Sequence, residues 1–223
     1  MTKIAFRDSG FTLVEVAIAI VIVGFLIGGA IVSLTTQLEI RNRSETAKTL
    51  ERARDALLGF AAVEGRLPCP ASGTGATAQE RSRESPTSGA CTNNFDGYLP
   101  ASTLGIGPVD SETGLLIDAW GRPIRYAVTA NNSKAFTKPG QMMSLGMPNL
   151  SPDLVVKDKF GNTLSENVVA IVLSTGKTNT GGGENANNDG TFTIDSEGDG
   201  FDDLAISISP YTLYNRMIAA GAL

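Results

Sequence analysis

The sequence predicts an α+β fold in which a long N-terminal helix, first transmembrane and then amphipathic, packs on a small antiparallel β-sheet head. Three observations lead to this prediction. Residues 1–67 contain no proline, and within them residues 16–34 carry no charge. Alanine and leucine then recur at helical spacing as far as residue 61. After residue 120, short apolar runs alternate with turn residues, which is typical of strands.

Residues 11–38 are interpreted as a membrane-spanning helix. The uncharged run 16–34 approaches the roughly 20 residues that a helix needs to cross a bilayer core. A cleaved secretory signal is the alternative, but its apolar run is about 7–15 residues long and ends at a small-residue cleavage site. The positive-inside rule does not orient the segment, because basic residues flank it equally on both sides.

The helix is expected to continue beyond the membrane as an amphipathic segment. Its apolar positions share one helical face: Ala47, Leu50, Ala53, Leu57 and Ala61. Charged residues fill the other positions, so we expect this face to be part of the core of the head. One helix from about 11 to 63 would be roughly 80 Å long. Pro68 and Pro70 end it.

Glu15 interrupts the apolar stretch near its start. A charged side chain at the bilayer centre costs about 2.5–3.5 kcal/mol on insertion scales, and less near the interface. Two interpretations remain open from the residues alone. The carboxylate either reaches the headgroups, or it is a buried charge that requires a partner.

The sequence RDSGFTLVE at residues 7–15 resembles the prepilin signature of type IV pilins and type II secretion pseudopilins. The resemblance implies that residues 1–10 are a leader, which a prepilin peptidase cleaves between Gly10 and Phe11. It also implies N-methylation of Phe11. Glu15 would then be an assembly residue, neutralised in a bundle of subunit helices by the amine of a neighbour's Phe11. A buried carboxylate without such a partner is costly, so the pair would fix the register of assembly.

The same resemblance implies a function. We expect a structural subunit that polymerises into a type II secretion pseudopilus or a type IV pilus-like filament after cleavage. The implied partners are copies of itself, other pilin-like subunits, the prepilin peptidase and an inner-membrane assembly platform. The implied location is the bacterial inner membrane, single-pass with residues 39–223 as a periplasmic pilin-like head, and then a periplasmic or surface filament. The alternative is a membrane-tethered, calcium-dependent binding module or adhesin.

The composition argues against an enzyme. The chain of 223 residues contains no histidine and two cysteines. This excludes Ser-His-Asp and Cys-His catalysis, His-ligated metal sites and four-cysteine zinc sites. A formal net charge of -5 also argues against nucleic acid as a partner. We therefore expect no catalytic residues.

Residues 64–97 are expected to form a long loop of small residues. A disulfide between Cys69 and Cys91 would explain such a loop in a compact domain, and two free buried thiols are the alternative. By the chain-entropy model, closing a loop of this size contributes roughly 3 kcal/mol. A periplasmic head would lie in an oxidising compartment, which allows the bond.

The remainder of the chain is expected to form strands and one helix. The strands are predicted at residues 124–128, 154–156, 168–173 and 204–208, the third of them a continuous apolar run as in a central strand. Ser209 and Pro210 open a last helix, which Gly221 closes.

Two segments of the head extend the resemblance. DAWGRPIRY at residues 118–126 is similar to the DxWGxPxxY stretch of major pseudopilins. LSTGK at residues 173–177, followed by a Gly/Asn-rich loop and the Asp202-Asp203 pair, is similar to the calcium loop region of the same family. Two segments depart from it, because residues 68–97 look like an insertion and residues 209–223 extend beyond the usual end.

The acidic segment 184–203 is the predicted cation site. It contains no lysine or arginine, and calcium takes roughly 6–8 oxygen ligands in irregular geometry. The expected ligands are Asp195, Glu197, Asp199, Asp202 and Asp203. The spacing of the first three is close to the start of a DxDxDG loop, but Ile206 stands where an EF-hand has its bidentate glutamate. A solvated acidic loop without metal is the alternative.

Overall fold

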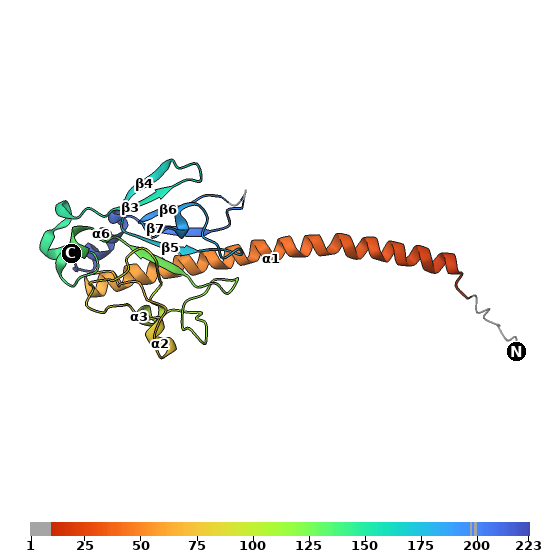
Figure 1. Ribbon diagram of the computed structural model, residues 1–223, viewed down its shortest axis with the longest axis horizontal. Helices are drawn as coiled ribbons and strands as arrows, with labels where there is room; N and C mark the ends of the chain where they lie inside the picture. The colour runs from red at the N-terminus through yellow and green to blue at the C-terminus, as the bar shows by residue number, and fades with distance from the viewer. Residues whose placement is uncertain (1–9, 197, 199) are drawn as a thin grey trace. The chain divides into compact units, whose positions relative to one another are not determined.

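The computed structural model describes residues 10–196, 198 and 200–223, except for the side chains of residues 26–34 and 186. The chain divides into two compact units, of which the first ends at Arg41 and the second is Asn42–Leu223. Helix α1 (Leu13–Glu64) contains the boundary (Figure 1). The predicted helix from about 11 to 63 is therefore confirmed. The leader, residues 1–10, lies outside the described residues except for Gly10.

The first unit exposes the described apolar side chains of α1. Phe11 is 86% exposed and Phe25 is 80% exposed. Within the described residues, no helix combines the length and the apolarity that crossing a membrane requires.

The described residues of the second unit form two sheets. One is antiparallel and has the order β1-β2-β5-β7. Its strands are β1 (Gly97–Tyr98), β2 (Arg125–Val128), β5 (Ala170–Ser174) and β7 (Leu204–Ile208). The other has the order β4-β3-β6. Its strands are β3 (Leu154–Lys157), β4 (Thr163–Val168) and β6 (Thr191–Thr193).

Short helices complete this unit. They are α2 (Ala78–Arg81), α3 (Ala101–Leu104), α4 (Asn131–Lys134), α5 (Gln141–Leu145) and α6 (Pro210–Ala219), with 3-10 turns η1 (Met147–Asn149) and η2 (Gly183–Ala186). In Figure 1 the labelled strands, β3 to β7, are drawn above the C-terminal half of α1, and helices α2 and α3 are drawn below it. The predicted α+β class, with a long helix packed on a sheet, is confirmed.

The main core lies between α1, the four-stranded sheet and α6. The buried α1 residues in it are Leu50, Ala53, Leu57, Leu58 and Ala61. The prediction for Ala47 is wrong, because its side chain is exposed while that of Thr46 is fully buried. At 3.6 residues per turn, Thr46 continues the buried stripe more closely than its neighbour does.

A second core lies between the two sheets. Alternate residues of β5 point to opposite sides, so that Val172 joins the main core and Ile171 and Leu173 join the second. β5 is therefore buried on both faces, which explains its continuous apolar sequence. The predicted strand 168–173 is confirmed for residues 170–173, but its first residue ends β4 in the other sheet.

Three other features differ from the sequence prediction. Strands β1 and β6, and all of β4 except its last residue, lie outside the predicted strands. Strand β6 pairs with β3 in parallel rather than antiparallel. Residues 64–97 are not a continuous loop, since they contain α2. That helix begins with a capping box in which Thr77 and Glu80 exchange hydrogen bonds.

Helix α6 forms as predicted. The hydroxyl of Ser209 accepts a hydrogen bond from the Thr212 amide at 3.2 Å, and Pro210 occupies the first turn. Leu213 and Met217 are fully buried against the main core.

Candidate functional site

The predicted processing and assembly residues lie at the start of α1. Thr12 precedes the helix, and its amide and hydroxyl both donate to Oε2 of Glu15 at 2.8 Å. In return, the Glu15 amide donates a hydrogen bond to the Thr12 hydroxyl at 3.3 Å. This reciprocal pair is a capping box, which satisfies amides that the first helical turn leaves unbonded.

The capping box is a role of Glu15 that the sequence analysis missed. Its signal is present in the sequence, as Thr12-Leu13-Val14-Glu15 matches the T-x-x-E pattern before an apolar run. Glu15 is exposed in the single chain, and Phe11 beside it is 86% exposed. The carboxylate is thus held at the helix start, next to the residue predicted to carry the new N-terminus.

The predicted disulfide between Cys69 and Cys91 is present, and both residues are fully buried. The disulfide closes a loop in the segment that follows α1. The hydroxyl of buried Tyr126 donates to the Pro68 carbonyl at 3.2 Å, and the Leu67 amide donates to the Phe136 carbonyl at 2.7 Å. The loop is therefore tied to the sheet as well as to itself.

A buried ion pair adjoins the disulfide. The Arg66 guanidinium donates to both carboxylate oxygens of Glu84 at 2.8 Å, and the Cys69 amide donates to the same carboxylate at 3.2 Å. The Arg66 guanidinium also lies 5.2 Å from the centre of the Phe60 ring. The hydrogen bonds to Glu84 raise the pKa of Arg66. Bidentate geometry and additional donors are what a buried pair needs to offset its desolvation.

The DAWGRPIRY stretch forms a turn that is anchored by Asp118. The Oδ1 atom of Asp118 accepts from the Trp120 and Arg122 amides at 2.9 and 2.8 Å. Its Oδ2 atom accepts from the Ser174 hydroxyl at 2.6 Å, which joins the turn to the end of β5. The side chain of Asp118 is buried. The aspartate therefore holds together the two segments that the sequence analysis compared with major pseudopilins.

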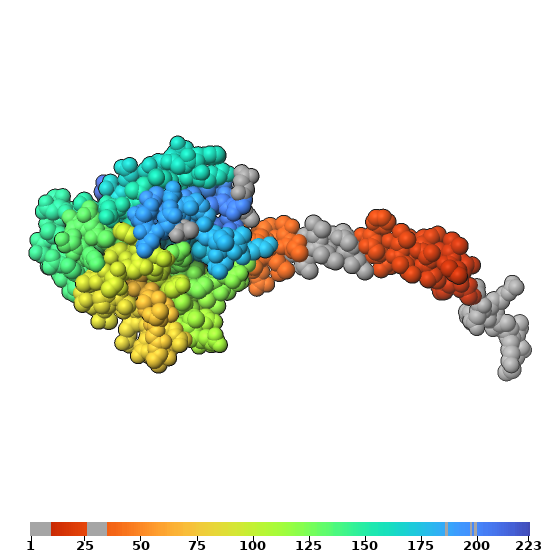
Figure 2. All heavy atoms as spheres, in the orientation of Figure 1, coloured from red at the N-terminus to blue at the C-terminus, as the bar shows by residue number. Residues whose placement is uncertain are grey.

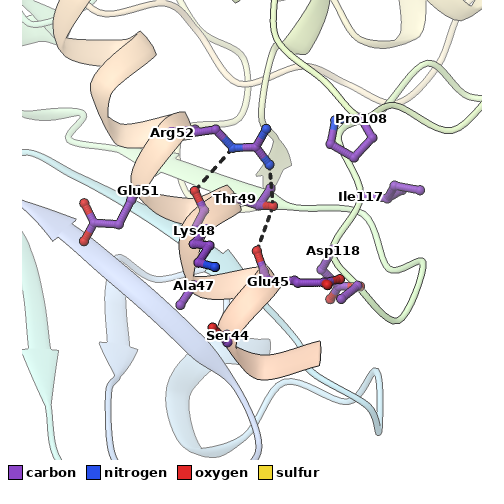
Figure 3. A pocket seen from close by; sticks show the side chains of 11 residues that line it. Ser44, Glu45, Ala47, Lys48, Thr49, Glu51, Arg52, Pro108, Ile117 and Asp118 are labelled. Atoms are coloured by element: carbon purple, nitrogen blue, oxygen red, sulfur yellow. Dashed lines mark hydrogen bonds between the residues drawn. The ribbon is translucent and has the colours of Figure 1, made fainter. Parts of the chain in front are cut away.

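A surface hollow of about 720 Å³ lies beside this turn, between α1 and residues Pro108, Ile117, Asp118 and Ala119 (Figure 3). The Ala119 amide donates to the Thr46 hydroxyl of α1 at 3.2 Å, which fixes the turn to the helix. On the helix side, Arg52 donates to the Thr49 hydroxyl at 3.0 Å, and Thr49 donates to the Glu45 carbonyl at 3.0 Å. The side chains of Arg52 and Thr49 therefore form these hydrogen bonds with other groups of α1.

The acidic segment is described in part, because Glu197 and Asp199 lie outside the described residues. The Asp195 carboxylate accepts from the Lys159 amide at 3.0 Å. The Asp202 carboxylate accepts from the amide and the hydroxyl of Thr178, both at 2.8 Å. Among the described residues, no group of three or more Asp, Glu, Cys or His side chains is placed to hold a metal ion.

Asp203 differs from these two aspartates because it is buried, with 3% of its surface exposed. Its Oδ2 atom accepts from the Gly182 amide at 2.8 Å and from the Asn185 side chain at 2.7 Å. Its Oδ1 atom has no hydrogen-bond partner within the described part of the chain. Burial raises the pKa of Asp203, and the two hydrogen bonds and the Arg125 guanidinium partly oppose this.

One comparison with known proteins supports the N-terminal prediction. Residues 6–31 match the family model of the prokaryotic N-terminal methylation motif. No curated protein and no solved structure gives a significant match to the chain. The match includes Gly10, Phe11 and Glu15, and it confirms the prepilin-type signature. The chain thus carries the N-terminal motif of a pilin-type prepilin peptidase substrate, a class that is structural rather than enzymatic.

Proposed function

We propose that the protein is a structural subunit that polymerises, after prepilin peptidase cleavage, into a type II secretion pseudopilus or a type IV pilus-like filament. The observation that carries the proposal is the methylation motif at residues 6–31, with Glu15 as the only charged residue from 11 to 38. A tethered binding module requires a membrane anchor, but its function does not require a carboxylate at the position of Glu15 in that anchor.

The proposed mechanism is assembly without chemistry of its own. Cleavage between Gly10 and Phe11 creates a new amine beside Glu15. In the filament, the apolar helices leave the lipid and pack together, and the Glu15 carboxylate of one subunit pairs with the Phe11 amine of its neighbour. A buried charge is stable only with such a partner, so subunits that dock at another axial position are disfavoured.

The proposed location follows from this mechanism. Residues 11–38 hold the unassembled subunit in the bacterial inner membrane, with the head in the periplasm. An inner-membrane assembly platform then adds the subunit to a filament that contains copies of this chain and other pilin-like subunits. The buried Cys69–Cys91 disulfide supports a periplasmic head, because such bonds persist in oxidising compartments.

Fractionation of the native host tests the proposal. Mechanical shearing is expected to release the chain from cells or spheroplasts in long filaments, together with other pilin-like subunits. Recovery of the chain only as a membrane-bound monomer, under conditions in which other filaments shear off, would support the tethered binding module instead.

We further propose that the acidic segment binds calcium. The Oδ1 atom of Asp203 supports this proposal, because it is buried and has no hydrogen-bond partner among the described residues, and such an oxygen is suited to bind an ion or a water molecule. Asp203 and Asp202 would contribute carboxylate oxygens, and calcium would supply positive charge among the acidic residues of 184–203. Its role would be to order this segment and stabilise the head.

Calcium is expected to raise the melting temperature of the full-length chain in detergent by about 5–10 °C. The reason is mass action, which contributes about 2.7 kcal/mol at a hundredfold excess over the dissociation constant. The measurement is a thermal melt with millimolar calcium and then with chelator. Asp203→Asn should abolish the shift, whereas Glu112→Gln, an exposed carboxylate in another turn, should retain it. An unchanged melting temperature with no calcium uptake by calorimetry would exclude the site.

A further inference from the structure

The turn that follows β5, residues 174–179, is fixed at its base by Asp118. The Ser174 hydroxyl donates to Oδ2 of Asp118 at 2.6 Å and accepts from the Gly176 amide at 3.1 Å. All three residues are buried. Because they are buried, the loss of one partner would leave a polar atom without a hydrogen bond. Two consecutive hydrogen bonds therefore connect Asp118 to the backbone of this turn.

The same turn contacts Asp202 of the acidic segment. The Asp202 carboxylate accepts from the amide and the hydroxyl of Thr178, both at 2.8 Å. A Cβ atom at Gly176 would lie 2.5 Å from the Asp202 carbonyl oxygen and 2.8 Å from its Oδ2 atom. The φ angle of Gly176, +60°, also favours glycine. The turn and Asp202 can therefore pack this closely only because residue 176 has no side chain.

The position of Asp202 matters because of its neighbour. Asp203 has the buried Oδ1 atom without a hydrogen-bond partner in the described part of the chain. Two adjacent carboxylates can share one calcium ion only if both are held within about 2.3–2.6 Å of it. Residues 177–180 are exposed, and Figure 2 shows the light-blue part of the chain that contains them at the surface of the head. The turn beside Asp202 is thus accessible to an ion from solution.

Asp118 itself is held independently of the acidic segment. Its Oδ1 atom accepts from the Trp120 and Arg122 amides, and its own amide donates to the Arg122 carbonyl at 2.9 Å. The next residue, Ala119, is bonded to the Thr46 hydroxyl of α1. The carboxylate therefore provides a fixed point to which the turn at residues 174–179 is attached.

We propose that Asp118 is a positioning residue for the calcium site, and that it holds Asp202 in place through Ser174 and the turn at residues 174–179. The inference rests on the proposed calcium site and adds a residue that lies far from the acidic segment in the sequence. Asp118 does not touch the ion. Its contribution is to fix Asp202 in advance, which reduces the ordering that binding would otherwise require.

Ser174→Ala tests the connection in the full-length chain in detergent. Calorimetry is expected to show a dissociation constant for calcium about 10–100-fold higher than that of the wild type, as for the loss of a residue that orients metal ligands. Ser82→Ala is the matched control. It removes another fully buried serine hydroxyl, which donates to the Ala78 carbonyl at 3.0 Å, and it should leave the dissociation constant unchanged. Thermal melts in chelator establish that each variant is folded.

Gly176→Ala tests the contact with Asp202 directly. The added methyl group must displace Asp202, so calcium binding is expected to weaken at least about tenfold. Gly140→Ala is the control for backbone strain, because Gly140 has a φ of +69° but a Cβ atom there would meet no atom within 4 Å. This variant should bind calcium as the wild type does.

A double variant tests whether Asp118 acts through Ser174. Asp118→Ala with Ser174→Ala should bind calcium no more weakly than Asp118→Ala alone, because both substitutions break the same connection. If Asp118→Ala does not fold, the variants of Ser174 and Gly176 decide the question.

The outcomes separate this inference from the calcium site. Additive losses in the double variant, wild-type affinity in Ser174→Ala or Gly176→Ala, or an equal loss in either control would overturn the positioning role while leaving the calcium site intact. A wild-type chain that takes up no calcium would overturn both.

Discussion

Replacing Glu15 with leucine is expected to lower the yield of sheared filaments by at least about a hundredfold while leaving the amount of membrane-bound protein unchanged. The variant leaves the neighbour's amine buried without a partner, and breaking a buried pair in this way costs about 3–5 kcal/mol. Insertion into the membrane should become easier, because a charge is removed from an apolar segment. Immunoblots of sheared and membrane fractions measure both quantities.

Thr12→Ala is the matched control for this experiment. It removes the capping partner that bonds to Glu15 but retains the carboxylate. Loss of a helix cap costs only about 0.5–2 kcal/mol and should affect the start of α1 rather than its register. If Glu15→Leu assembles normally, or if Thr12→Ala is equally defective, Glu15 does not fix the register of assembly.

Glu84→Ala is expected to lower the melting temperature of the full-length chain in detergent by about 6–20 °C. Removal of the carboxylate leaves the buried Arg66 guanidinium without its bidentate partner, at a cost of about 3–5 kcal/mol. One kcal/mol corresponds to about 2–4 °C for a protein of this size. The amide of Cys69 also loses its acceptor, so the effect should include the disulfide loop.

Two variants distinguish the ion pair from a general effect of substitution. Glu112→Ala removes an exposed carboxylate and should shift the melting temperature by little. The double variant Arg66→Met with Glu84→Leu replaces both charges by apolar groups of similar size, and it should be more stable than Glu84→Ala. Equal stability of Glu84→Ala and the wild type would show that the buried pair contributes nothing.

The elements that could be predicted from the sequence are those whose pattern of apolar residues indicates that they are buried. Helix α1, strands β2 and β5 and helix α6 are all recognisable because they contribute periodic or continuous apolar residues to a core. The outer strand β4 could not be recognised, since five of its six residues are exposed and carry no pattern of alternation. The parallel pairing of β6 with β3 depends on the path of a long connection, which no local pattern encodes.

The candidate site was predictable where a motif fixes its residues. Gly10, Phe11 and Glu15 were predicted from the sequence signature, and all three lie within residues 6–31, which the family model matches. The partners of Asp118 and Glu84 were not predictable, because Ser174 and Arg66 are brought to them only by the fold.

Intact-mass measurement of the chain recovered from sheared filaments tests the central claim most directly. Cleavage and methylation predict the mass of residues 11–223 with one added methyl group, located on the amine of Phe11. A filament-borne chain that retains residues 1–10, or one that begins at any position other than Phe11, would contradict the proposed prepilin processing.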